Sequence, residues 1–319
     1  MLTHIILITI GSALVSYGAR IMVDGSSSLA KRFNISDLVI GLTVVAFGTS
    51  SPELIVSVIA ASTGKADVAL GNVIGSNMMN ICLILGLAAL IRPLGVQRNT
   101  VWKEIPLSLL GIIVAFFMAN DLLFDGRGPS AISRIDGLVL LSFFAIYLYY
   151  MFEIARNYPQ ISTPDMHQRP VWLSVSMVLG GIAALTFGGQ LVVESAIGIA
   201  RFLGISEAVI GLTLVAVGTS IPELATSIVA ARRGNTDIAV GNVVGSNIFN
   251  VFMILGVSAT VAPLPLGNIK MSDFIACILM TALLFLFCFV QESRVVTKWK
   301  GLAFLGIYAA YMAYLLSGL

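Results

Sequence analysis

Apolar stretches separated by short polar segments make up almost the whole chain. Several of them reach about 18 residues or more, the length that a helix needs to cross roughly 30 Å of hydrocarbon. The first stretch is interpreted as a span and not as a signal peptide, because no cleavage-like small-residue site follows it before Arg20. The pattern predicts ten membrane-spanning helices, at about 3–22, 36–62, 66–91, 101–119, 135–153, 171–193, 206–231, 236–261, 272–290 and 300–317.

The second half of the chain repeats the first. Residues 36–86 and 206–256 align without a gap and are identical at about 30 of 51 positions. Self-similarity at one long period indicates a duplicated unit. Each unit contains five predicted spans, an odd number, so two units in series must lie in opposite orientations in the membrane. This is the inverted-repeat plan of many secondary transporters, which bind their substrates near the midplane between the halves.

The repeat also predicts how the chain is divided. Residues 1–153 and 171–319 are expected to form the two five-helix units. Residues 154–170 lie between them and are polar and proline-bearing, so we expect a linker that is too short to be a domain. The predicted fold class is therefore an all-α polytopic membrane protein made of two inverted five-helix repeats.

Composition and charge agree with this fold and add an orientation. The chain is 58% hydrophobic and 11% charged, whereas soluble domains carry about 25% charged residues. Thirteen of the 18 Lys and Arg residues fall in loops after the odd-numbered spans. The positive-inside tendency then predicts that these loops and the linker are cytoplasmic and that both termini are outside. A net charge of +2 gives no indication of nucleic-acid binding.

Two polar motifs interrupt the apolar pattern at equivalent places. The sequence Gly-Thr-Ser-Ser-Pro-Glu occupies residues 48–53, and Gly-Thr-Ser-Ile-Pro-Glu occupies residues 218–223. Each motif places a carboxylate inside a predicted span, which costs a few kcal/mol unless a cationic partner is present. Each proline lacks an N–H and so frees a carbonyl of the preceding turn. Carboxylate, hydroxyl and carbonyl oxygens are the ligands that hard cations such as Ca²⁺ prefer.

A second pair of motifs follows in the next predicted spans, at residues 71–80 and 241–250. Asn72, Ser76 and Asn80 are spaced four residues apart, so they share one helix face. The glycines beside this face have the small-residue spacing that allows close helix packing, and packing is their expected main role. For Asn72 and its counterpart Asn242, hydrogen bonding between helices is the alternative to ion binding.

Other chemistry is poorly supported. Cys82, Cys277 and Cys288 lie singly in apolar runs, and the two histidines have no ligand-type neighbours, so no resident metal or cofactor is expected. An intramembrane hydrolase is disfavoured, because Ser50 and Ser220 have no His or Lys at a plausible membrane depth to act as a base. The absence of a phosphate-binding loop argues against pumping driven by ATP. A calcium channel is an alternative class of protein. Whether calcium transport depends on sodium counterflow would decide between a channel and an exchanger.

The duplicated Gly-Thr-Ser-x-Pro-Glu and Gly-Asn-x-x-Gly-Ser-Asn motifs resemble those of the sodium/calcium exchanger family of calcium/cation antiporters. The likeness covers nearly the whole chain and is of the prokaryotic type, without a large regulatory loop. It implies exchange of Na⁺ for Ca²⁺ by alternating access, with three sodium ions per calcium and therefore net charge movement. It also implies that the first and sixth spans slide. The expected partners are the lipid bilayer and the transported Na⁺ and Ca²⁺ ions, with no nucleic acid or nucleotide.

The resemblance further implies four cation positions between the second, third, seventh and eighth spans. Calcium would be bound by the Glu53 and Glu223 carboxylates and by the main-chain oxygens of Thr49 and Thr219. Sodium or shared positions would use Ala46, Ser50, Ser76, Asn80, Ala216, Ser220, Ser246 and Asn250.

The coupling ion is left open between sodium, proton and potassium-dependent exchange. Four serines flanking the glutamates favour sodium, because a proton requires only a titratable group. Some relatives have aspartate at the position of Asn250, where an acid goes with potassium dependence or altered protonation, so the amide favours potassium-independent exchange. Two ionised glutamates carry a charge of −2, which either one Ca²⁺ or two Na⁺ can neutralise.

Overall fold

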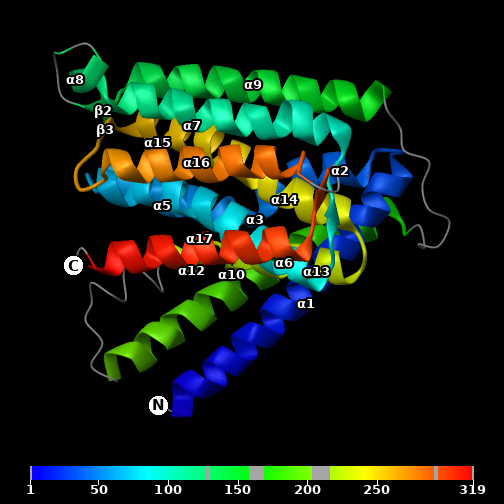
Figure 1. The fold of residues 1–319 in the computed structure, drawn as a ribbon. Coiled ribbons are helices and arrows are strands. Elements are labelled where there is room, and N and C mark those ends of the chain that lie inside the picture. The colour runs from blue at the N-terminus through cyan, green and yellow to red at the C-terminus, as the bar shows by residue number, and fades with distance from the viewer. Residues whose placement is uncertain are drawn as a thin grey trace.

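The computed structural model describes residues 2–124, 126, 130–157, 169–202, 216–290 and 294–317, and these residues are mostly helical (Figure 1). The first half contains α1 (Leu2–Arg32), α2 (Asp37–Ile40), η1 (Gly41–Val45), α3 (Ala46–Thr49), α4 (Ser51–Ser62), α5 (Ala66–Met79), η2 (Asn80–Ile84), α6 (Leu85–Ile91), η3 (Thr100–Glu104), α7 (Ile105–Ala119), α8 (Asp121–Phe124) and α9 (Arg134–Asn157). The second half contains α10 (Val171–Phe202), α12 (Ala216–Gly218), α13 (Ile221–Arg232), α14 (Thr236–Ile248), η5 (Phe249–Leu255), α15 (Gly256–Val261), α16 (Met271–Phe287) and α17 (Lys298–Ser317). Elements marked η are turns of π-helix.

The helices follow the apolar pattern closely. The predicted spans at 66–91 and 236–261 have the same limits as the continuous runs α5–η2–α6 and α14–η5–α15. Within the described residues, seven helices are long and apolar enough to cross a membrane, or eight if the bent pair Asp37–Thr49 and Ser51–Ser62 counts as one span. Helix α16 is apolar but shorter, and the predicted span at 206–231 is described only from residue 216. The predicted count of ten spans therefore stays a prediction.

Helices α1 and α10 are longer than the predicted spans 3–22 and 171–193. The reason is that polar residues near the predicted ends have hydrogen-bond or ion-pair partners. Asp24 lies beyond the predicted end of the first span and forms an ion pair with Arg233, which follows α13. In α10, the amide of Gln190 donates to the Glu194 carboxylate one turn further on, at 2.8 Å. Polar residues with such partners let both helices continue past the apolar stretch.

Helices α1 and α10 pack along each other and lean away from the rest of the bundle (Figure 1). Glycines make this close contact possible. A Cβ atom on Gly18 would lie 2.9 Å from the Ala184 Cβ, and one on Gly181 would lie 2.7 Å from the Met22 Cβ. Small residues at a helix interface let the two backbones approach closely, as in other membrane helix pairs.

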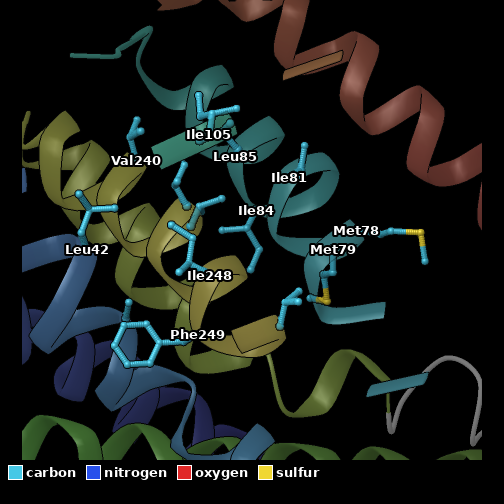
Figure 2. Close-up of a cluster of buried hydrophobic side chains, with 14 of the residues drawn as sticks. Leu42, Met78, Met79, Ile81, Ile84, Leu85, Ile105, Val240, Ile248 and Phe249 are labelled. Carbon is cyan, nitrogen blue, oxygen red and sulfur yellow. The ribbon is translucent and has the colours of Figure 1, made fainter. Parts of the chain in front are cut away.

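The inner helices of the molecule are the two that carry the asparagine motifs. The run Thr236–Val261 is almost entirely buried, and Ala66–Ile91 is mostly buried. Figure 2 shows part of the apolar core around them, with Leu42 of η1, Ile84 of η2 and Ile248 of α14 in one cluster. A Cβ atom on Gly245 of α14 would lie 2.7 Å from the Leu42 carbonyl oxygen, which confirms the packing role expected there. For the first copy, the equivalent partner segment lies outside the described residues.

Two short antiparallel pairs tie loops of the two halves together. Strand β1 (Leu94–Gly95) pairs with β4 (Val295–Val296), and β2 (Ala131–Ile132) pairs with β3 (Leu264–Pro265). Each pair joins a loop that ends a span of one half to a loop of the other. The polar backbone of these loops is thereby satisfied where the spans end.

Candidate cation-binding site

Each glutamate motif breaks its helix at a serine. Ser50, between α3 and α4, has φ −82° and ψ 4°, and the segments Asp37–Thr49 and Ser51–Ser62 are bent by 47°. Ser220, directly before α13, has nearly the same conformation, with φ −89° and ψ 8°. A proline in the first turn of the following helix begins each new segment, where its missing N–H costs nothing. The predicted proline-broken helices are confirmed in both copies.

The two breaks meet through crossed hydrogen bonds between the halves. The hydroxyl of Ser50 donates to Glu223 Oε1 at 3.0 Å, and that of Ser220 donates to Glu53 Oε1 at 3.1 Å. Both carboxylates are 1% exposed, and both serines are fully buried. The duplicate motifs, 170 residues apart in sequence, therefore form one site.

Asn242 holds the second-half motif in place. Its Nδ2 donates to the main-chain oxygen of Glu223 at 3.3 Å and to Ser227 Oγ at 2.9 Å. Its Oδ1 accepts from the hydroxyl of Thr49 in the other half, at 3.0 Å. The side chain is fully buried, and both ends of its amide are used. For Asn242, hydrogen bonding between helices is therefore the role that the structure gives.

Asn72 repeats this arrangement for the first-half motif. Its Nδ2 donates to the main-chain oxygen of Glu53 at 3.2 Å and to Ser57 Oγ at 2.9 Å. Its Oδ1 accepts from the hydroxyl of Thr219 at 3.2 Å. Each asparagine bonds to the main-chain oxygen of a glutamate. The two asparagines therefore hold the backbone from which each glutamate side chain extends.

Five buried side-chain oxygens of the expected ion ligands have no hydrogen-bond partner in the part of the chain that the structure describes. They are Glu53 Oε2, Glu223 Oε2, Asn80 Oδ1, Asn250 Oδ1 and Ser246 Oγ. Buried polar atoms in proteins are nearly always partnered, so each exception asks for an explanation. Oxygen atoms of this kind, supplied by both halves in a buried place, fit the ligand preference of Na⁺ and Ca²⁺.

Other expected ligands are engaged within the protein. Ser76 Oγ lies 3.2 Å from Ser220 Oγ, which places Ser76 beside the crossed pair. The carbonyl of Ala46 accepts the Ser50 N–H at 3.0 Å. Ala216, its counterpart, begins α12.

Two site residues were missed by the sequence interpretation. Asn77 Oδ1 accepts from Asn250 Nδ2 at 3.0 Å, and Asn247 Oδ1 accepts from Asn80 Nδ2 at 2.9 Å. Asn77 lies on α5 and Asn247 on α14. Each follows directly after the serine of the polar face that the four-residue spacing defines, so it lies on a neighbouring face of its helix. The signal that could have found them is their occurrence in both copies of the Gly-Ser-Asn motif.

A third buried carboxylate lies outside this site. Glu104 of η3 is fully buried and accepts a hydrogen bond from the hydroxyl of Tyr150 in α9. The ammonium of Lys103 lies 5.2 Å from the centre of the Tyr150 ring. Glu104 is thus a carboxylate of similar burial with a different set of partners, which makes it a useful control.

The chemistry of the site is that of reversible binding. No group of three or more His, Cys, Asp or Glu side chains that could hold a metal occurs in the part of the chain that the structure describes. The acidic groups of the candidate site are one carboxylate pair, with neutral hydroxyl and amide oxygens beside it. Oxygen-only sets of modest charge suit hard cations that must also leave. An apolar helical bundle with such a site defines a multi-pass membrane transporter of cations.

Comparison with known protein families identifies which class of transporter this is. The family described as sodium/calcium exchanger protein matches residues 3–153 and 173–317. The chain belongs to this family, and the resemblance seen in its motifs is confirmed. The family consists of cell-membrane antiporters that move Na⁺ and Ca²⁺, and its members are neither enzymes nor users of a cofactor.

Individual relatives are similar over their whole length. Inner membrane protein YrbG of Escherichia coli strain K12 is 36% identical over 329 residues, covering 99% of this chain and 97% of the relative. Sodium/calcium exchanger MaX1 of Methanosarcina acetivorans is 30% identical over 346 residues, covering 98% of each. A solved structure of the sodium-calcium exchanger NCX_Mj, soaked with zero Na⁺ and Ca²⁺, has a TM-score of 0.83 and 36% identity, covering 98% of both chains.

Proposed function

We propose that this protein exchanges Na⁺ for Ca²⁺ across the cell membrane by alternating access. The observation that carries the proposal is the crossed pairing of Ser50 with Glu223 and of Ser220 with Glu53. It joins the two motifs, which we propose to be oppositely oriented, into one buried cluster whose remaining oxygens have no partner among the described residues. Membership of the exchanger family and similarity to MaX1 and NCX_Mj support the same ions.

The calcium ion is proposed to bind between the two halves. Glu53 and Glu223 supply one unpartnered carboxylate oxygen each, and the main-chain oxygens of Thr49 and Thr219 complete the position. Sodium ions use the same glutamates together with Ala46, Ser50, Ser76, Asn80, Ala216, Ser220, Ser246 and Asn250. A serine hydroxyl can donate its hydrogen to a carboxylate and still offer a lone pair to a cation. The serines can therefore stay bonded to the glutamates while sodium is bound.

Competition between the ions follows from charge. Two ionised glutamates in a low-dielectric site are costly without cations, and either one Ca²⁺ or two Na⁺ offsets their charge of −2. The two ions can then replace each other at one site without a large electrostatic difference. A third sodium ion per cycle makes the exchange electrogenic.

The proposed architecture is ten spans in two inverted five-helix units, 1–153 and 171–319, joined by a cytoplasmic linker at 154–170, with both termini outside. The helix limits support it, and so do contacts that recur between equivalent residues of the two halves. The gating element is proposed to be the pair α1 and α10. Glycines let the two helices pack closely against each other, so the pair can move as one body relative to the core.

The test is uptake of radioactive calcium into proteoliposomes that contain the purified protein. Gradients of Na⁺, K⁺ and H⁺ are imposed one at a time. Sodium-driven uptake that needs no potassium is the expected result. Uptake driven only by a proton gradient, or only when potassium is present, would assign the chain to the alternative antiporter types. Calcium entry without any counterflow would indicate a channel.

A further inference from the structure

A run of buried asparagine amides connects the two halves one helical turn beyond Ser76, which lies next to Ser220. Asn247 Nδ2 donates to the main-chain oxygen of Asn77 at 3.4 Å. Asn80 Nδ2 donates to Asn247 Oδ1 at 2.9 Å. All three side chains are at most 2% exposed. The run therefore begins at a main-chain carbonyl of the first half, passes through a side chain of the second half and ends on Asn80.

This order of bonds determines which way each amide faces. An asparagine side chain has a donor end and an acceptor end, whereas a main-chain carbonyl can only accept. The Asn247 nitrogen must therefore face Asn77, and its oxygen must face Asn80. Asn80 then has to donate, which turns its own oxygen to the opposite side. That oxygen, Asn80 Oδ1, is buried and accepts no hydrogen bond from any residue that the structure describes.

The other half contains the equivalent bond to Asn250. Asn250 Nδ2 donates to Asn77 Oδ1 at 3.0 Å, and Asn250 Oδ1 is likewise buried without a partner among the described residues. The two unpartnered amide oxygens thus occur at equivalent positions of the two motifs, each fixed by an asparagine of the opposite half.

We propose that Asn247 and Asn77 are positioning residues, which hold the Asn80 and Asn250 amides with their oxygens toward the transported cation. The proposal rests on the function proposed above, because it assumes a cation at this site. A cation binds the oxygen of an amide and is repelled by its NH₂ group. If an amide could turn either way, orienting it on binding would cost free energy and weaken the affinity for the cation. Holding the amide in the right orientation beforehand removes that cost.

The test is a double-mutant cycle on calcium affinity, measured as binding of radioactive calcium to the purified protein. Leucine replaces asparagine because it has nearly the same shape and no hydrogen-bonding groups. Asn247→Leu alone is expected to weaken calcium binding about tenfold, which corresponds to roughly 1.4 kcal/mol. In an Asn80→Leu background, Asn247→Leu is expected to cause no further loss, because the residue through which it acts is already gone.

The symmetric pair provides matched controls. Asn77→Leu and Asn250→Leu should behave as the first pair does. In the crossed combination of Asn247→Leu with Asn250→Leu, the losses are expected to multiply, because these residues belong to different pairs. Thermal stability without calcium is measured in parallel. A merely structural role of Asn247 would lower stability and leave calcium affinity unchanged in the molecules that remain folded.

Two results would overturn the positioning role. The first is an unchanged calcium affinity in folded Asn247→Leu. The second is that the affinity losses of Asn247→Leu and Asn80→Leu multiply in the double variant, as those of Asn247→Leu and Asn250→Leu are expected to do. Glu53→Gln serves as the separate check on the proposed function. If the wild type binds calcium and Glu53→Gln does not, the function stands whatever the cycle shows. A wild-type protein that binds no calcium would overturn both proposals.

Discussion

The hydroxyl of Ser50 donates to the carboxylate of Glu223, at 3.0 Å, and not to Glu53 of its own motif. Ser220 donates in the same crossed way to Glu53. Each carboxylate is therefore held by the half of the protein to which it does not belong. The crossed bonds therefore tie the two motifs into one unit of the core, past which the proposed gating pair α1 and α10 can move to open the site to each side in turn.

Replacing Ser50 with alanine is expected to weaken sodium binding more than calcium binding. The variant removes an oxygen proposed as a sodium ligand and a hydrogen bond to a charged group, worth about 1.5–3 kcal/mol. The sodium concentration for half-maximal exchange should rise about tenfold or more. Ser220→Ala should give a similar shift because its contacts are equivalent.

The neighbouring serine gives the control for this measurement. Ser51 Oγ donates to the carbonyl of Phe47 in the preceding α3 and has no contact with the carboxylates among its described hydrogen bonds. Ser51→Ala should leave the sodium dependence unchanged. Equal effects of Ser50→Ala and Ser51→Ala would show that the crossed bond is not specific to the site.

Asn242 is expected to matter for stability. Asn242→Leu leaves Thr49, Ser227 and the main-chain oxygen of Glu223 without their partner in a fully buried place. Unsatisfied buried groups cost about 1–3 kcal/mol each. The midpoint of thermal unfolding of the detergent-solubilised protein should fall by several degrees. Asn268, an exposed residue whose amide bonds to Asp67, is the matched control, and Asn268→Leu should leave the midpoint nearly unchanged.

The contact between α1 and α10 can be tested with two adjacent glycines. A Cβ on Gly181 would lie 2.9 Å from the Gly18 carbonyl oxygen, so Gly181→Ala should push the helices apart or hold them in one position. Gly180 has no atom within 4 Å of its Cβ position, and Gly180→Ala should be tolerated. We expect the maximal rate of sodium-driven calcium uptake to fall in the first variant only. Equal rates in both variants would argue that the close packing of α1 on α10 has no part in the proposed movement of the pair.

Much of the site could be predicted because its chemistry is local in sequence. A proline, a carboxylate and two hydroxyls within six residues fix both the helix break and the ligand type, and the repeat places a second copy opposite. The crossed partners could not be predicted, because hydrogen bonds between Ser50 and Glu223 depend on how the halves dock. The length of α1 was missed for the same reason, since Asp24 is satisfied by Arg233 from the other half. The roles of Asn77 and Asn247 also depend on contacts between halves, which helical spacing within one span cannot reveal.

The central claim is that Glu53 and Glu223 together bind the transported calcium ion. Its most direct test is sodium-driven uptake of radioactive calcium by Glu53→Gln and Glu223→Gln, with Glu104→Gln as the control for loss of a buried carboxylate elsewhere in the membrane. Glutamine keeps the shape and removes the charge that a divalent ion requires. We expect either site variant to abolish uptake although the protein is folded and inserted, and we expect Glu104→Gln to retain it. Near-normal uptake in Glu53→Gln or in Glu223→Gln would contradict the claim.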